Sequence, residues 1–316
     1  MSGSQPDQRV LGRWLVFLAT VFWGGTATLA RSVFRDGGVP APTAVELRLL
    51  IAVSLLFAWL LVRNRAALKV ERADRGALVV LGLFGVAAVQ GTYYWSIARL
   101  GVGLAILLQY VAPSLIVLWE MARGKRPSPP MIAAVLLALA GTALLVVGVD
   151  RSSVHATAFD WCVGASSSVI FAFYVLASKK LVARHAPETV LVYTFAIAAV
   201  FWMCVTPPWR IIAAHYPASM WVRFAVLGVF STLVPFRCFY SGLKRLPAAE
   251  AGVIATAEPV VAILSAFLVL GEGLRPGQMF GAVMVIVAAV LASLDTRRPP
   301  RRGSSAAERA PMRVRP

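Results

Sequence analysis

The sequence is poor in charge: Asp, Glu, Lys and Arg make up only 14% of its 316 residues. An ordinary soluble domain carries about 25% of charged residues, so this chain has too little charge to cover a soluble surface. Cysteine is also scarce, and the three scattered residues Cys162, Cys204 and Cys238 exclude a disulfide-rich secreted scaffold. The hydrophobic share of 59% excludes a disordered chain. A polytopic membrane protein remains.

Acidic residues are few, because 14 Asp and Glu stand against 31 Lys and Arg, and the formal net charge is +17. A basic face on a soluble domain would indicate nucleic-acid binding. Here the basic residues lie between apolar stretches or are concentrated in the last 22 residues. We therefore expect a lipid bilayer around the chain and no nucleic-acid partner.

Long unbroken apolar runs predict transmembrane helices and not the alternating strands of a membrane barrel. A helix needs about 20 mostly apolar residues to cross a bilayer. The first run carries Trp23 and Arg31 and leads into a second span, so it is not a cleaved signal peptide. The sequence predicts an all-α integral membrane protein with ten spans, near 14–34, 42–62, 76–98, 102–122, 130–149, 158–181, 189–206, 218–243, 248–270 and 276–294.

The basic residues predict the orientation of these spans. With residues 1–13 in the cytoplasm, the cytoplasmic segments hold 22 Lys and Arg and the outer segments hold seven. Short cytoplasmic loops carry such an excess. We therefore expect a bacterial inner-membrane protein with both termini in the cytoplasm. Residues 295–316 mix Arg, Pro, Ser and Ala without periodicity and predict a basic, disordered cytoplasmic tail.

The two halves of the chain repeat each other. Residues 81–115 align without a gap on 227–261, at an offset of 146, and eight of the 35 positions are identical. An apolar composition produces chance matches among Leu and Ala, but it does not readily explain the matches of Tyr94 with Tyr240, Arg99 with Arg245 and Pro113 with Pro259. The repeat unit is five helices, 14–149 and then 158–294. Because five is odd, the second copy is inverted in the membrane, which is a signature of secondary transporters with a midplane site at the repeat interface.

The same residues carry a family resemblance. The second half contains Gly242-Leu-Lys-Arg-Leu-Pro-Ala-Ala-Glu-Ala-Gly-Val, Ala257-Glu-Pro-Val-Val-Ala and Leu270-Gly-Glu-Gly-Leu, and the first half contains Phe22-Trp-Gly-Gly and Glu46-Leu-Arg-Leu-Leu. These motifs resemble the EamA module of the drug/metabolite transporter superfamily over about 14–294. Within it, the chain is similar to ten-helix exporters of the aromatic amino-acid exporter type. The resemblance implies export of amino acids and related metabolites by alternating access.

Charges inside the spans are costly and usually face the bundle interior or a water-filled path. Those far from helix ends are Glu46, Arg48, Arg237 and Glu258. Glu258 lies near the midplane, and we expect Arg237 and Glu258 to contact the charged ends of an amino acid. The alternative is that these two pair with each other, which we expect in at least one state of transport. Arg48 matches a family position, and both a cavity role and a packing role remain open.

Polar and aromatic residues inside the spans complete the candidate substrate site. Tyr110 lies deep in its helix, three residues before Pro113; the resemblance implies a substrate role, and a packed core residue is the alternative. The aromatic exporters carry a Trp directly before the proline, where this chain has Ala112, which makes a smaller or broader amino-acid range more plausible. Pro113 and Pro259 distort their helices, either beside a cavity or as bare kinks. The remaining candidates are Trp23, Gln90, Tyr94, Phe171 and Tyr174.

Other classes of function have weaker support in the sequence. His155, His185 and His215 fall in loops, so no Ser–His dyad lies within the spans, and no His/Cys spacing predicts a metal site. We expect no cofactor and no enzyme activity. A scaffold or receptor without transport does not need an inverted repeat. A carrier of the same fold for a drug, an organic acid or a sugar nucleotide stays open. Gly277-x-x-x-Gly281 permits close helix packing, which we expect within a monomer.

Overall fold

The computed structural model describes residues 5–35, 38–146, 156–271, 273 and 275–294. Its first half consists of α1 (Gln5–Gly25), α2 (Ala27–Arg35), α3 (Ala41–Arg63), the short 3-10 turn η1 (Arg65–Leu68), α4 (Arg72–Val80), the π-helical segment η2 (Leu81–Ala87), α5 (Ala88–Leu100), α6 (Val102–Gln109), α7 (Ala112–Ala122) and α8 (Pro129–Val146).

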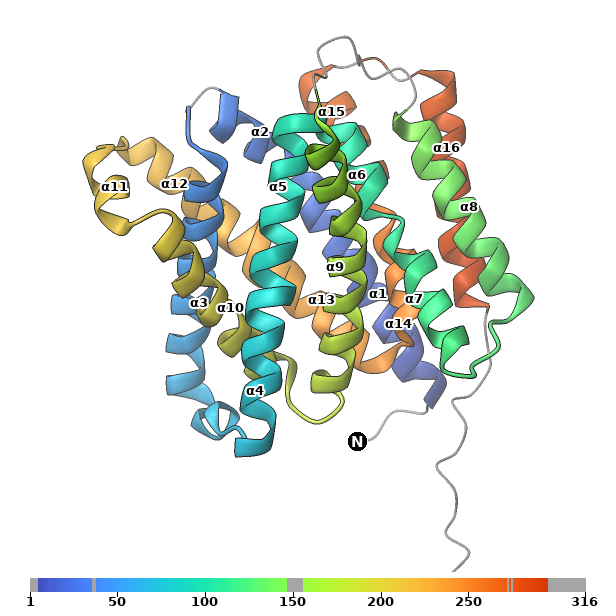
Figure 1. Ribbon diagram of the computed structural model, residues 1–316, viewed down its shortest axis with the longest axis horizontal. Coiled ribbons are helices and arrows are strands. Elements are labelled where there is room, and N and C mark those ends of the chain that lie inside the picture. The colour runs from blue at the N-terminus through green and yellow to red at the C-terminus, as the bar shows by residue number, and fades with distance from the viewer. Residues whose placement is uncertain (1–4, 36–37, 147–155, 272, 274, 295–316) are drawn as a thin grey trace, which may run out of the picture.

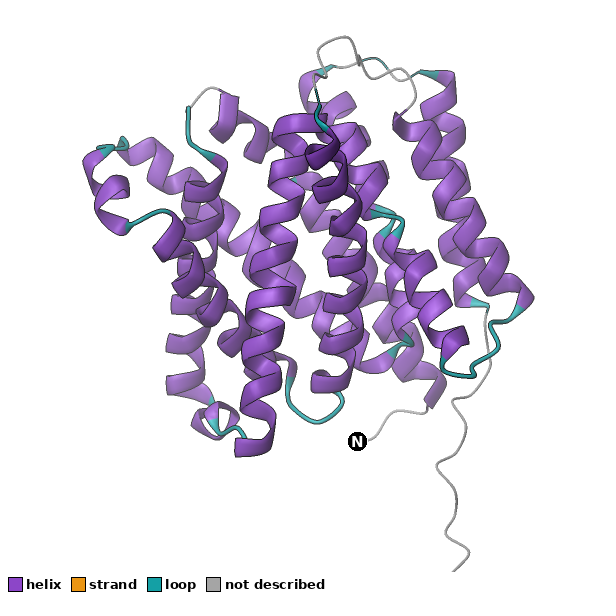
Figure 2. Cartoon of the chain, in the orientation of Figure 1, coloured by secondary structure: helices purple, strands orange, loops and turns teal. Residues whose placement is uncertain are grey.

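The second half consists of α9 (Ala158–Val182), α10 (Pro187–Val205), α11 (Pro208–Ala213), α12 (Ala218–Val226), the π-helical segment η3 (Leu227–Leu233), α13 (Val234–Arg245), α14 (Ala248–Ala255), α15 (Glu258–Leu270) and α16 (Pro276–Ser293). The described residues form helices and connecting loops without a strand (Figure 2). The helices form one bundle (Figure 1), so the all-α prediction is confirmed.

Nine segments of the described residues are long and apolar enough to cross a membrane, and each coincides with one predicted span from 42–62 onward. The predicted first span, 14–34, corresponds to α1 and α2. Helix α1 begins at Gln5, well before residue 14, and its 21 residues extend about 31 Å at 1.5 Å per residue. It packs against α13, α14 and α15 within the bundle (Figure 1). The predicted tail, 295–316, lies outside the described residues.

The two halves share their irregularities as well as their helices. The π-helical segments η2 and η3 begin at Leu81 and Leu227, which are 146 residues apart. The breaks between α6 and α7 and between α14 and α15 are separated by the same offset, as are the starts of α3 and α10. Helices α1 and α9 begin at opposite ends of the bundle (Figure 1). The fold is therefore two five-helix repeats that run in opposite directions.

Proline begins several of these helices. Pro129, Pro187, Pro208 and Pro276 are the first residues of α8, α10, α11 and α16. A proline at this position costs no hydrogen bond, because the first N–H groups of a helix have no partner within it. Pro113 of α7 and Pro259 of α15 have a different role, because they lie inside predicted spans and mark internal breaks.

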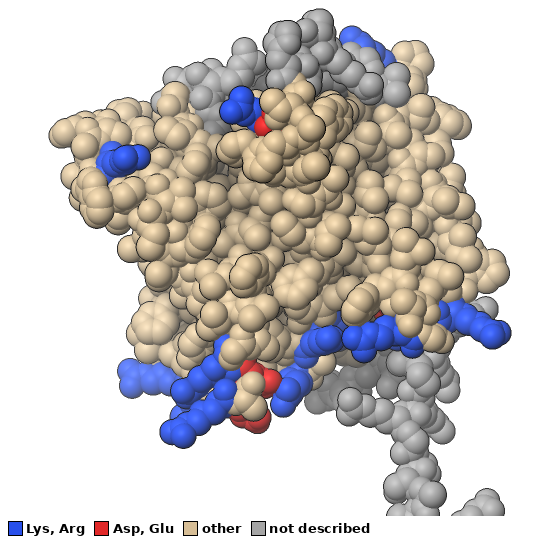
Figure 3. All heavy atoms as spheres, in the orientation of Figure 1, with Lys and Arg blue, Asp and Glu red and all other residues tan. Residues whose placement is uncertain are grey.

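Charged side chains gather at the two ends of the bundle and leave an apolar band between them (Figure 3). The basic residues are concentrated at the end where α1 begins, in α1 itself, in the last turn of α13 and in the links after α3, α7 and α9 (Figure 3). The band matches the position of a lipid bilayer around a helical membrane protein.

Two buried acidic residues, Glu250 and Asp74, stabilise the packing at this basic end. Neither was singled out in the sequence. Glu250 of α14 is fully buried and accepts hydrogen bonds from Arg9 and Arg13 of α1, at 3.3 Å and 2.7 Å. Asp74 of α4 pairs with Arg184 and His185, which follow α9, both at 2.7 Å. Each buried carboxylate is thus compensated by cations from a different part of the chain, as burial of a charge requires.

Glycine allows the last helices of the two repeats to touch. A Cβ atom on Gly281 of α16 would lie 2.6 Å from the carbonyl oxygen of Gly141 of α8, and a Cβ on Gly141 would lie 2.8 Å from that of Gly281. Gly277 has no atom within 4 Å of such a position. Of the predicted Gly277-x-x-x-Gly281 pair, Gly281 alone makes a close contact, and that contact is within the chain.

Candidate functional site

The fourth helix of each repeat is broken in the middle. Tyr110 and Val111 interrupt α6 and α7, and Pro113 follows in the first turn of α7. Thr256 and Ala257 interrupt α14 and α15, and Pro259 follows in the first turn of α15. Because a proline lacks a backbone N–H, the helix cannot continue its hydrogen bonds through these points. Both breaks carry polar side chains deep in the bundle.

Tyr110 and Glu258 connect the two breaks. The Tyr110 hydroxyl donates a 2.6 Å hydrogen bond to Glu258 Oε2, and Tyr110 is only 4% exposed. Glu258 is the first residue of α15, so its carboxylate lies at the positive end of that helix dipole, which favours a negative charge. The breaks therefore place an acidic group between the two repeats.

Arg48 of α3 supplies a positive charge to the same region. It is 7% exposed, and its guanidinium donates to Thr232 Oγ1 of η3 at 3.0 Å and to the Tyr94 hydroxyl of α5 at 2.6 Å. Arg48 and Tyr93 are both close enough to Glu258 to interact with it electrostatically. We call Arg48, Tyr93, Tyr94, Tyr110, Thr232 and Glu258 the central polar cluster.

The charges of the cluster come from different repeats. At the offset of 146, the position of Arg48 corresponds to Thr194 and that of Glu258 corresponds to Ala112. Thr194 is neutral and donates to the Val190 carbonyl of its own helix, whereas Arg48 bonds across helices to Tyr94. The first repeat thus contributes the cation and the second contributes the anion, in a scaffold that is otherwise duplicated.

Aromatic rings extend from the cluster toward α1. The ring of Tyr110 is 6.4 Å from that of Phe171, which stacks on Tyr174 at 5.7 Å. Tyr174 in turn stacks on Phe239 at 6.3 Å, and Phe239 lies 5.6 Å from Trp23. This series joins four of the predicted site residues into one wall. Phe239, which links two of them, was not among the candidates.

The Phe22-Trp-Gly-Gly motif brings α1 against the start of α15. A Cβ atom on Gly24 would lie 2.7 Å from the carbonyl oxygen of Glu258 and 2.8 Å from the backbone nitrogen of Ala262. Real Cβ atoms do not approach backbone so closely, so only glycine fits at this position. Gly24 therefore positions the backbone that carries Glu258.

Glu46 lies two residues before Arg48 on α3. Its side chain is fully buried, and both carboxylate oxygens have no hydrogen-bond partner among the described residues. A buried polar group without a partner is costly and rare in native proteins. Glu46 was noted as an intramembrane charge in the sequence but was not placed in the site.

Most of the predicted site residues lie in one region. Trp23, Tyr94, Tyr110, Phe171, Tyr174 and Glu258 belong to the cluster or its aromatic wall. Gln90 is buried one turn before Tyr94, and Pro113 and Pro259 follow the two breaks. Arg48, Tyr93 and Thr232 are not among the predicted site residues, although the motif Glu46-Leu-Arg and the adjacent tyrosines Tyr93 and Tyr94 are visible in the sequence.

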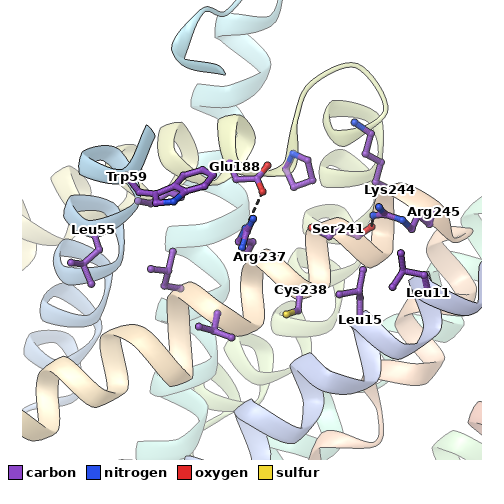
Figure 4. Close-up of a pocket in the computed structure, with 14 residues that line it drawn as sticks. Leu11, Leu15, Leu55, Trp59, Glu188, Arg237, Cys238, Ser241, Lys244 and Arg245 are labelled. Carbon is purple, nitrogen blue, oxygen red and sulfur yellow. Dashed lines mark hydrogen bonds and ion pairs between the residues drawn. The ribbon is translucent and has the colours of Figure 1, made fainter. Parts of the chain in front are cut away.

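Arg237 is separated from this region. Its Nε donates to Glu188 Oε1 at 2.9 Å, its guanidinium lies 5.4 Å from the ring centre of Trp59, and its side chain is 52% exposed. The expected Arg237–Glu258 pair is thus not formed in this structure. Arg237 instead lines a groove at the basic end of the bundle (Figure 4).

The described residues contain no group of three His, Cys, Asp or Glu side chains that could hold a metal ion.

Comparisons with known proteins identify relatives of the whole chain. The EamA-like transporter family matches it twice, over residues 10–147 and 161–294. The threonine/homoserine exporter RhtA of Escherichia coli is 28% identical over 290 residues, which cover 90% of this chain and 91% of that protein. An inner membrane transporter of Salmonella typhimurium, YicL, is 25% identical over 290 residues, covering 90% of this chain and 95% of that one. A crystal structure with 24% identity has a TM-score of 0.73 and covers 92% of this chain and 98% of its own, which supports the fold alone.

Proposed function

The chain belongs to the EamA-like transporter family, and we propose that it exports amino acids and related small metabolites by alternating access at the central polar cluster. The carrying observation is the Tyr110–Glu258 hydrogen bond that joins the two helix breaks, in a cluster that also holds the buried cation Arg48. A transporter built from inverted repeats binds its substrate near the midplane, at the repeat interface. The cluster lies at the helix breaks that meet there.

An amino acid matches the charges of the cluster. Its α-carboxylate is a bidentate acceptor for the guanidinium of Arg48, and its ammonium donates to the carboxylate of Glu258. The hydroxyls of Tyr94 and Tyr110, which now bond to these two residues, are exchanged for the substrate when it enters. Since Arg48 and Glu258 belong to different repeats, a bound zwitterion joins the two halves that move relative to each other.

The first break supports a proposal for the size of the cargo. Ala112 leaves only a methyl group directly before Pro113, and Ala112 is fully buried. The aromatic wall fills the side of the cluster that faces α1. We therefore propose small or hydroxylated amino acids, in agreement with the threonine and homoserine named for RhtA. The alternative is a carrier of the same fold for another cargo, such as a drug, an organic acid or a sugar nucleotide.

The charge distribution supports a proposed orientation in the membrane. By the positive-inside rule, the basic residues at the end where α1 begins support a cytoplasmic position for that end, and we propose that both termini are cytoplasmic in an inner membrane. Reporter fusions at Pro316 and at Pro217, in the link between α11 and α12, should report opposite compartments. The same compartment for both would contradict the proposed orientation.

Counterflow in proteoliposomes tests the cargo. Vesicles loaded with unlabelled threonine should accumulate labelled threonine through the wild-type chain. The variant Glu258→Gln, which keeps the size of the side chain and removes its charge, should lose most of this flux. Glu120→Gln is the matched control, because Glu120 is far along α7 and pairs with Lys125 at 3.0 Å. Wild-type flux with a nucleotide sugar or an organic acid but none with amino acids would favour the alternative cargo.

A further inference from the structure

A groove of about 810 Å³ opens between α1, α3 and α13 at the basic end of the bundle. Figure 4 shows its residues: Leu11 and Leu15 on α1, Leu55 and Trp59 on α3, and Arg237, Cys238, Lys244 and Arg245 on α13. Its volume is at the upper end of the range for small-molecule sites, roughly 300–1,000 Å³. No residue of the central polar cluster lines the groove, and Arg237, which does, pairs with Glu188 and not with Glu258.

The walls of the groove are apolar and face outward. Leu11 is 43% exposed on α1, and Leu55 and Trp59 are 47% and 44% exposed on α3. Leu233 and Val234 line its inner end. Val234 and Lys244 lie about 15 Å apart along α13 at 1.5 Å per residue, which is half of the roughly 30 Å hydrocarbon core. The groove therefore has the depth of one leaflet.

Three cations line the groove toward the basic end. Arg237 is paired with Glu188, but Lys244 bonds the His185 carbonyl, and Arg245 bonds Gln8 and the Ser241 carbonyl. Neither Lys244 nor Arg245 has an acidic partner in the part of the chain that the structure describes. The groove thus keeps an excess of positive charge beside apolar walls.

The repeat does not require these cations. At the offset of 146, Arg237 corresponds to Gly91 and Lys244 corresponds to Ala98, while Arg245 alone has a basic counterpart in Arg99. The duplicated fold forms its third helix equally well with small neutral residues at two of the three positions. The positive charge is therefore a property of this groove and not of the scaffold.

We propose that the groove binds an anionic phospholipid from the leaflet at the basic end of the bundle. Its phosphate lies against Lys244 and Arg245, Arg237 reaches the same headgroup from below, and an acyl chain lies along Leu15, Leu55 and Val234. Basic pockets between transmembrane helices on the cytoplasmic side recognise acidic headgroups in this way. The apolar depth and the net charge match a lipid better than a small hydrophilic amino acid.

Cys238 provides a reporter within the groove. A chain with Cys162→Ser and Cys204→Ser retains Cys238 as its single cysteine, and both replaced residues are exposed, so the fold tolerates them. The purified full chain in a neutral detergent is labelled at Cys238 with a small maleimide. Titrated phosphatidylglycerol should slow the labelling, and phosphatidylcholine should do so only at much higher concentration. Soluble glycerol phosphate should give no protection, because it has no acyl chain.

The variants separate the groove from the general surface. Each cation near a membrane surface contributes a factor of about five to the binding of an acidic lipid. Lys244→Ala and Arg245→Ala should each weaken protection by phosphatidylglycerol about fivefold. The matched control is Arg65→Ala, which removes an exposed cation from the link after α3, at the same end of the bundle but outside the groove. It should leave the protection unchanged.

Three results would overturn the proposal. One is equal protection by phosphatidylglycerol and phosphatidylcholine, and another is an equal loss in the Arg65 control and the groove variants. The third is protection of Cys238 by threonine, which would assign the groove to the transport path. Because the labelling needs no transport, it can succeed or fail independently of the proposed cargo.

Discussion

The Tyr110 hydroxyl donates a 2.6 Å hydrogen bond to Glu258 Oε2, and the two residues lie in equivalent helix breaks of opposite repeats. The bond therefore crosses the interface at which the two halves must move if transport follows alternating access. Its short length and the low exposure of Tyr110 indicate a strong contact to an acidic group. The hydrogen bond thus links the two repeats, and a substrate can compete with the Tyr110 hydroxyl for the Glu258 carboxylate.

We expect Tyr110→Phe to strengthen substrate binding and to preserve the fold, because it removes the hydroxyl with which the substrate competes for Glu258. The variant keeps the ring that packs on Phe171 and removes one hydrogen bond to a carboxylate, which contributes about 1.5–3 kcal/mol. Because the substrate no longer has to displace this bond, the KM for threonine in counterflow should fall about tenfold. Tyr193→Phe is the control, because the Tyr193 hydroxyl bonds the Leu68 carbonyl at 2.6 Å, away from the cluster. Equal effects of both variants on KM would remove Tyr110 from the substrate site.

Arg48 and Glu258 should behave as a coupled pair. Arg48→Ala leaves the carboxylate of Glu258 with less compensation and removes the donor to Thr232 and Tyr94, so the free energy of unfolding should fall by about 3–5 kcal/mol. Adding Glu258→Gln should cost less in the Arg48→Ala background than in the wild type. Denaturation in detergent micelles measures this cycle. Additive losses would show that the two residues act separately, and additivity is what we expect for Arg237→Ala combined with Glu258→Gln.

Gly24 offers a test with a neighbouring control. Gly24→Ala places a Cβ atom 2.7 Å from the Glu258 carbonyl oxygen, so α1 and α15 must separate, and we expect a loss of about 1–3 kcal/mol in stability. Gly25→Ala meets no atom within 4 Å and should be neutral or slightly stabilising. Thermal unfolding of the two purified variants measures the difference. If both unfold alike, the close contact at Gly24 is not needed.

Periodicity and the inverted repeat predicted much of this architecture. The ten spans follow from hydrophobic length, and nine of them match within a few residues. The prolines Pro113 and Pro259 predicted the breaks, because a missing N–H interrupts a helix wherever it falls. Tyr110, deep in its helix, and Glu258, near the midplane, were both predicted site residues, and the structure places them in contact. Their role in binding a substrate stays a prediction.

The face on which a residue lies was harder to predict than its depth. Arg48 and Arg237 are both intramembrane arginines, and the sequence favoured Arg237 because it lies close to Glu258 along the chain. The π-helical segment η3, which directly precedes α13, widens a turn and so rotates the residues after it. Arg237 then points to the outer groove, whereas Arg48 reaches the cluster. The start of α1 at Gln5 was missed because Asp7, Arg9 and Arg13 lowered its hydropathy. Glu250, the partner of the two arginines, is distant in sequence.

We expect Glu46 to be needed for transport and to lower the stability of the folded chain. Its buried carboxylate oxygens have no partner among the described residues, and such a group is destabilising by about 1–3 kcal/mol. Glu46→Met fills a similar volume without a polar atom, so the variant should unfold at a higher temperature. A side chain that lowers stability inside a membrane is expected to act in binding or in a moving state, and the same variant should therefore lose counterflow activity. Glu120→Met, at a partly exposed and paired site, should change neither quantity. A less stable Glu46→Met would mean that the carboxylate makes a favourable contact, and unchanged transport in a stabilised variant would mean that Glu46 has no part in the cycle.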